Sequence, residues 1–128
     1  MRVAFTGGPK TGKTTLAGPT AIHTDMFVGL PWENQADEVA YLLDRPSDEL
    51  KIEGITVALG LRRWLQWHPK GKPVDVVNVL HQPIRELNDR QQILAERVCD
   101  VMKDIRHSLE TRGVLVVDFT GPIFEKGK

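Results

Sequence analysis

The chain has little cysteine and no excess of charge of either sign. Its 128 residues include one cysteine, Cys99, and 17 basic residues balance 17 acidic ones. A lone thiol excludes a disulfide within the chain and favours an intracellular setting. A formal net charge of zero excludes the overall basic field that drives non-specific binding to nucleic acid, although a local basic patch is still compatible with it.

Long hydrophobic runs are also missing from the sequence, and we expect no leader peptide. No apolar stretch approaches the roughly 20 residues that cross a bilayer as a helix, and the N-terminus enters an apolar strand directly. His23, His81 and His107 lack the spacing with Cys99 that a zinc site requires. We therefore expect a single cytoplasmic domain over residues 1–128, with no membrane partner.

The most informative stretch is residues 7–14, which read Gly-Gly-Pro-Lys-Thr-Gly-Lys-Thr. A glycine, four residues and Gly-Lys-Thr form the P-loop or Walker A pattern, whose backbone N–H groups cradle phosphate oxygens. The predicted contacts to a nucleoside triphosphate come from Gly8, Lys10, Thr11, Gly12, Lys13, Thr14 and Thr15. We expect Lys13 to reach the β- and γ-phosphates and the Thr14 hydroxyl to bind Mg²⁺. ATP and Mg²⁺ are the predicted cofactors.

Apolar strands and helical patterns alternate along the chain. Strands are predicted at residues 3–5, 20–24, 50–55, 74–80 and 114–119. Helices are predicted to begin at Lys13, after a cap at Asn34, over residues 57–67, and after a cap at Asp89 with Gln92 in its first turn. This alternation predicts an α/β fold, a five-stranded parallel sheet with helices on both faces. Ligands of such sheets bind beyond the carboxyl ends of the strands.

Asp25 and Glu53 are the acids placed just beyond predicted strand ends. Asp25 is interpreted as a catalytic and substrate-binding group that takes the proton of an attacking hydroxyl or orients it. The alternative is a cap for the following segment. Glu53 is interpreted as part of the Mg²⁺ site or as a substrate contact, and the alternative is a solvated acid before a glycine turn.

Arginine and tryptophan supply the remaining candidates. Arg97 is predicted to contact the γ-phosphate from the last helix, with Arg85 and Arg90 as alternatives for the same task. Arg62 is predicted to bind the acceptor, and Trp32 to stack on a base. The alternative for Arg62 is a surface pair with Arg63 that flanks a buried Trp64. A solvated helix face is the alternative for the other arginines.

With these motifs, the chain resembles the small kinases of the P-loop superfamily, such as nucleoside and nucleotide kinases, shikimate and gluconate kinases, and the kinase half of polynucleotide kinase. The resemblance follows the element order over nearly the whole chain and is motif-specific at residues 7–14. It is weaker at Ile22-His23-Thr24-Asp25 and Lys51-Ile52-Glu53-Gly54, which look like the strand-two acid and the strand-three acid-glycine of these kinases. These two stretches, with a tryptophan after the first, also look like P-loop kinase-like proteins of bacteriophages, some of which phosphorylate hydroxymethylated bases in DNA.

The resemblance implies a sheet order of 2-3-1-4-5, with Glu53 near Thr14 and the metal. It also implies a kinase that transfers the γ-phosphate of Mg²⁺–ATP to a hydroxyl of a nucleoside- or nucleotide-type acceptor. The acceptor is either a free molecule or DNA, where the hydroxyl belongs to a 5-hydroxymethyluracil base or to a 5′-hydroxyl end. If the enzyme is phage-encoded, it would work in the host cytoplasm.

Two features depart from the family pattern: Glu53 replaces the usual aspartate, and no arginine-rich lid is evident. The alternatives are an ATPase or nucleotide-dependent switch without an acceptor, and a binding protein that has lost catalysis.

Overall fold

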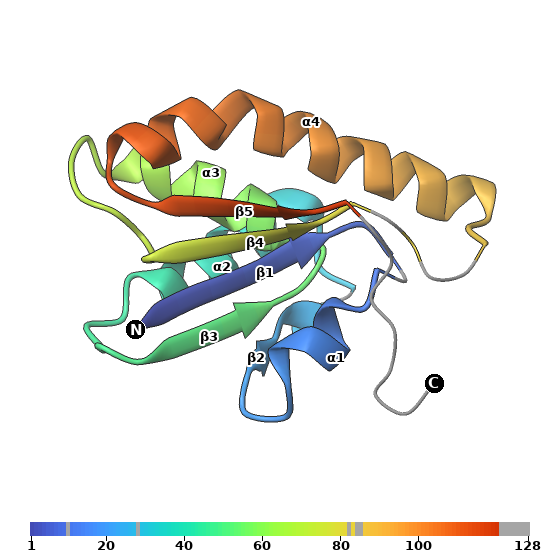
Figure 1. Cartoon of the computed structure of the whole chain (residues 1–128), viewed down its shortest axis with the longest axis horizontal. Coiled ribbons are helices and arrows are strands. Elements are labelled where there is room, and N and C mark those ends of the chain that lie inside the picture. Colours follow the sequence, from blue (N-terminus) through green and yellow to red (C-terminus); the bar gives the residue numbers. More distant parts are fainter. Residues whose placement is uncertain (10, 28, 82, 84–85, 121–128) are drawn as a thin grey trace.

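The computed structural model describes residues 1–9, 11–27, 29–81, 83 and 86–120. Along the chain lie β1 (Arg2–Gly7), α1 (Lys13–Ala17), β2 (Ile22–His23), the 3₁₀ helix η1 (Thr24–Phe27), α2 (Trp32–Leu43), β3 (Leu50–Glu53), α3 (Val57–Trp67), β4 (Val76–Leu80), α4 (Asp89–Thr111) and β5 (Leu115–Phe119). The five strands form one parallel sheet in the order β2-β3-β1-β4-β5 (Figure 1). The predicted fold class and strand order are confirmed.

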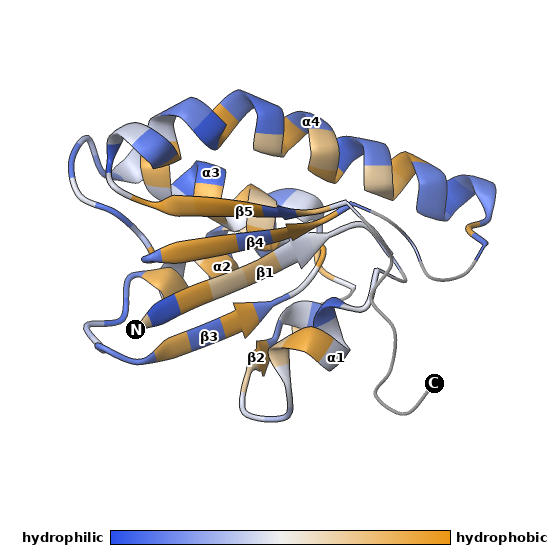
Figure 2. Cartoon of the chain, in the orientation of Figure 1, coloured by the Kyte–Doolittle hydropathy of each residue, from blue (hydrophilic) through white to orange (hydrophobic). Residues whose placement is uncertain are grey.

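Helices cover the two faces of the sheet unequally. Alternate strand residues such as Ala4, Ile52 and Val77 are fully buried in a large core that includes side chains of α2, α3 and α4. The intervening residues of β1 face the other way, and Phe5 packs with Ala17 of α1 in a small second core. Apolar residues dominate the strands, whereas α4 alternates apolar and polar positions, as expected for a helix with one buried side (Figure 2).

Two predicted helix caps are wrong in position. Helix α4 is capped by Asn88 rather than Asp89, because the Asn88 side chain accepts the Gln91 N–H at 2.8 Å and Gln91 returns the contact at 3.0 Å. Helix α2 begins at Trp32, before the predicted cap at Asn34. Pro31 precedes the helix with φ −56°, and its fixed ring permits the helix to begin directly after it.

Two strands end earlier than their apolar runs predict. The second strand is confined to Ile22–His23, because Thr24 and Asp25 enter η1. The third strand ends at Glu53, and the Gly54 N–H is still bonded to the Phe5 carbonyl of β1 at 3.1 Å. The chain therefore leaves both strands at the same edge of the sheet, and this places Asp25 and Glu53 close to residues 7–14.

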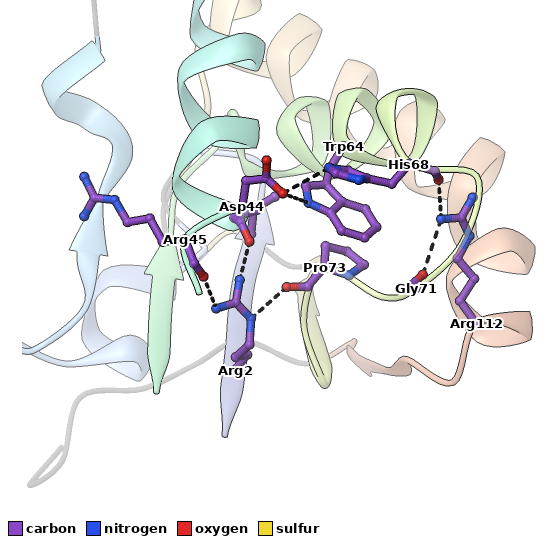
Figure 3. Close-up of polar contacts among 9 residues, drawn as sticks. Arg2, Asp44, Arg45, Trp64, His68, Gly71, Pro73 and Arg112 are labelled. Carbon is purple, nitrogen blue, oxygen red and sulfur yellow. Dashed lines mark hydrogen bonds and ion pairs between the residues drawn. The ribbon is translucent and has the colours of Figure 1, made fainter. Parts of the chain in front are cut away.

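A polar network fastens the amino ends of the strands (Figure 3). The Arg2 guanidinium donates to the carbonyl oxygens of Arg45 and Pro73, each at 3.0 Å. The Trp64 indole N–H donates to the Asp44 carboxylate at 3.3 Å. These contacts join β1, α2 and α3 at the edge of the sheet opposite the carboxyl ends of the strands. We therefore assign these residues a structural role.

Candidate functional site

Residues 7–14 connect the carboxyl end of β1 to α1. Gly12 stands before α1 with φ 88°, a left-handed conformation that favours glycine. The Thr11 hydroxyl donates to the Gly8 carbonyl oxygen at 3.1 Å and holds the loop in its turn. Gly8 lies against α4, since a Cβ added there would come within 2.6 Å of the Ala95 Cβ. The loop is therefore fixed both by its own contacts and by a helix from the far end of the chain.

Lys13 begins α1 and is buried, with 8% of its surface exposed. Its Nζ donates to the Gly8 carbonyl oxygen at 3.0 Å, so the cation lies over the loop backbone. Burial lowers the pKa of Lys13, and the charge of Glu53 partly opposes this effect. A desolvated ammonium group in this position is suited to neutralise an incoming anion.

Glu53 is a buried carboxylate at the carboxyl end of β3, with 3% of its surface exposed. The Thr14 hydroxyl donates to its Oε1 at 3.3 Å, and the His23 Nδ1 lies 2.5 Å from the same oxygen. The other oxygen, Oε2, is buried without a hydrogen-bond partner among the described residues. This oxygen is therefore free to accept a hydrogen bond or to contact a cation.

Thr14 and Glu53 fit a Mg²⁺ ion by chemistry. Mg²⁺ takes oxygen ligands, and it commonly uses one or two protein groups together with waters and phosphate oxygens. No cluster of three or more His, Cys, Asp or Glu residues that could hold a metal exists in the described part of the chain. By their chemistry, the two oxygen-bearing side chains suit a Mg²⁺ ion whose other ligands are waters or phosphate oxygens.

A cavity of about 560 Å³ lies at this edge of the sheet. It brings together five of the predicted site residues, namely Lys13, Thr14, Asp25, Trp32 and Glu53. Asp25 is exposed on η1, and Trp32 is the first residue of α2. The cavity thus places Lys13, Thr14 and the buried Glu53 along one hollow with a solvent-accessible carboxylate.

The predicted arginines are divided between two cavities. Arg90 lines the cavity with Lys13, whereas Arg62 and Arg97 line a neighbouring cavity of about 210 Å³. The Arg97 guanidinium carbon lies 4.9 Å from the centroid of a Trp32 ring, which is a cation–π contact. Lys10 and Arg85 lie outside the described residues.

Thr15 is exposed on α1 and is not among the described residues that line the cavity.

Sequence reasoning missed His23. Its contact depends on the parallel pairing of β2 with β3, in which His23 is the register partner of Glu53. The sequence contains a histidine two residues before Asp25, but neither spacing nor composition indicates which strand will lie beside it. Tertiary structure alone makes His23 part of the site.

A second polar cluster lies at the ends of β4 and β5. His81 Nε2 is 2.8 Å from one Asp118 carboxylate oxygen, and Arg106 of α4 is 2.7 Å from the other. The hydrogen bond from His81 is the largest influence on the pKa of Asp118; with the hydrogen bond and charge of Arg106 it outweighs the opposing effect of burial and holds this pKa below its usual value of 3.8. Both carboxylate oxygens of Asp118 therefore have partners, and the contact with Arg106 links α4 to the sheet.

Comparison of the chain with family models, with curated proteins and with solved structures found no match. Within the described residues, no helix is both long enough and apolar enough to cross a membrane.

Proposed function

We propose that the chain is a P-loop kinase-like phosphotransferase that uses Mg²⁺–ATP. Its acceptor is a hydroxyl of a nucleoside- or nucleotide-type molecule, either free or on DNA as a 5-hydroxymethyluracil base or a 5′-hydroxyl end. The observation that carries the proposal is the group formed by Lys13, Thr14 and the orphaned oxygen of Glu53. Lys13 and Thr14 belong to the Gly-x4-Gly-Lys-Thr pattern, and the three residues lie at the carboxyl edge of a 2-3-1-4-5 sheet, where α/β proteins bind ligands.

Each side chain has a distinct task in this reaction. Bound Mg²⁺–ATP supplies the phosphoryl group and neutralises part of its charge. Lys13 binds the β- and γ-phosphates, while Thr14 and Glu53 hold the cation. His23 fixes Glu53 through the 2.5 Å contact to Oε1, which leaves Oε2 for the cation or its water shell. Positioning and charge account for most of the rate in phosphoryl transfer, so a rigid arrangement is favourable.

Asp25 is the acceptor-side group. It shares the cavity with Lys13 and Thr14 but is exposed, so an acceptor can reach it from solvent. There it accepts the proton of the attacking hydroxyl or orients that hydroxyl. Arg90, which lines the same cavity, and Arg97, which stacks on its wall residue Trp32, are the candidates for contact with the γ-phosphate.

The test is transfer of labelled γ-phosphate from Mg²⁺–ATP to a panel of acceptors. The panel holds nucleosides, nucleoside monophosphates, 5′-hydroxyl oligonucleotides and hydroxymethyluracil-containing DNA, with Lys13→Ala as the blank. We expect label on one acceptor class, and at least a hundredfold less in the blank, about the loss found when one charge-stabilising donor is removed. Label in free phosphate alone would instead indicate an ATPase or nucleotide-dependent switch.

The lone Cys99, without a possible disulfide, supports a cytoplasmic location for this reaction.

A further inference from the structure

The cavity of about 210 Å³ beside the main one has an unusual concentration of positive charge. Arg62, Arg63 and Arg97 all contribute to its lining, and Glu33 is an acidic residue that shares it. The whole chain has a formal net charge of zero, so this local excess is not a general property of the surface. Trp32 lines both cavities.

The ion pairs divide the three arginines into one that is occupied and two that are available. Arg63 forms ion pairs with Glu33 and Asp37. Neither Arg62 nor Arg97 has a carboxylate partner among the described residues, and Arg97 is held by its stacking on Trp32. Because Glu33 is taken by Arg63, it does not neutralise the other two. Two arginines therefore line the cavity without an acidic partner in the described part of the chain.

Guanidinium groups recognise phosphate by planar, paired N–H donors, and two of them on one cavity match a single phosphate group well. We propose that this second cavity binds a phosphate of the acceptor, through Arg62 and Arg97. The acceptor then passes Trp32, and its hydroxyl end lies in the main cavity near Asp25. The proposal rests on the proposed phosphotransfer function and makes its substrate class narrower: a phosphorylated nucleoside or a DNA chain rather than a free nucleoside.

The test compares two acceptors that carry the same hydroxyl and differ by one phosphate. The probes are 5-hydroxymethyl-2′-deoxyuridine and its 5′-monophosphate, and their affinities are measured by calorimetry with a non-hydrolysable ATP analogue and Mg²⁺ present. The readout is the ratio of the two dissociation constants. We expect the native protein to prefer the monophosphate, and Arg62→Gln and Arg97→Gln each to reduce that ratio by about tenfold or more.

Arg45→Gln is the matched control. Arg45 is exposed in the loop after α2 and is not among the described residues that line either cavity. This variant removes one positive charge as the others do, and should leave the ratio unchanged. Thermal unfolding of each variant shows that the fold is intact. A native ratio near one, or an equal decrease in Arg45→Gln, would overturn the phosphate site.

The same measurements separate this proposal from the proposed function, because binding is measured without turnover. A preference that depends on Arg62 and Arg97, together with no transfer to any acceptor, supports the phosphate site and contradicts the kinase. A third probe, a single-stranded oligonucleotide carrying the same base, identifies the source of the phosphate. Tighter binding of the oligonucleotide with a steeper salt dependence indicates backbone phosphates, since each neutralised phosphate of a single strand changes the log–log slope by about 0.7. Otherwise the ligand is a free mononucleotide.

Discussion

Gly60→Ala is expected to destabilise the protein, although alanine favours helices. Gly60 lies in α3, where it is buried against α2. A Cβ added at this position would come within 2.1 Å of the Val39 Cγ1 and 2.4 Å of the Val39 Cβ. Val39 is fully buried, and its Cβ is fixed to the backbone of α2. The overlap can be relieved only if the two helices move apart.

Two opposing contributions to the free energy of unfolding set the magnitude. Replacing glycine by alanine in a helix interior stabilises by about 1 kcal/mol. Overpacking a well-filled core costs about 1–3 kcal/mol, and a contact more than 1 Å inside the usual carbon–carbon separation belongs at the upper end. We therefore expect a net destabilisation of about 1–2 kcal/mol. For a domain of this size this lowers the melting temperature by roughly 3–10 °C.

Urea unfolding is the assay, because the midpoint and the slope report stability and exposed surface separately. The control is an Asp104→Ala and Asp104→Gly pair on the exposed side of α4, which measures helix propensity without a core contact. A stabilisation of Gly60→Ala equal to the difference within that pair would refute the packing argument. The acceptor-phosphate preference should also decrease in Gly60→Ala, since Trp32 and Arg62 lie on the two helices that separate.

Two further substitutions test the loop and the cluster at β5. Gly8→Ala should weaken ATP binding, measured by calorimetry, by about tenfold or more, because the new methyl group meets Ala95 and displaces the loop. Adding Ala95→Gly to this variant should restore part of the affinity. If Gly8→Ala alone left the affinity unchanged, the close contact with Ala95 would be contradicted. Asp118→Asn should lower stability at about pH 5, where the carboxylate is ionised and bonded to His81 and Arg106. Because the folded-state pKa of Asp118 lies below its usual value of 3.8, its contribution is present above that value and is lost as the pH falls through the folded pKa. Urea unfolding in steps below about pH 5 should therefore show the difference between native and variant proteins closing, and a constant difference would exclude this linkage.

The order of strands and helices was predictable because the period of apolar residues changes along the chain. Buried parallel strands read as short apolar runs, and α4 shows apolar residues at helical spacing, from Val98 to Leu109. The boundaries were less predictable. Asn88 and Asp89 are both good caps, and only the side-chain contact with Gln91 distinguishes them.

The Lys13 and Thr14 part of the candidate site was predictable because its residues are adjacent in sequence. Local backbone geometry fixes such a loop, so a spacing pattern is enough to indicate it. The contact between Glu53 and Thr14, 39 residues apart, was expected only through the strand order that the resemblance implies. The contact of Glu53 with His23 of β2, 30 residues away, was not expected. A pairing between strands fixes such contacts, and strand pairing is a non-local choice.

The sequence by itself determined that this chain is an α/β domain with a phosphate-binding pattern after its first strand. Periodicity, turn residues and a contiguous motif are local properties of the chain, so they can be recognised without knowledge of the tertiary contacts. Tertiary structure decided that His23 supports Glu53 and that Arg97 lies on Trp32 with Arg62 lining the same cavity. These contacts join separate elements: the pairing of β2 with β3 makes the first, and the packing of α2, α3 and α4 against one face of the sheet makes the others.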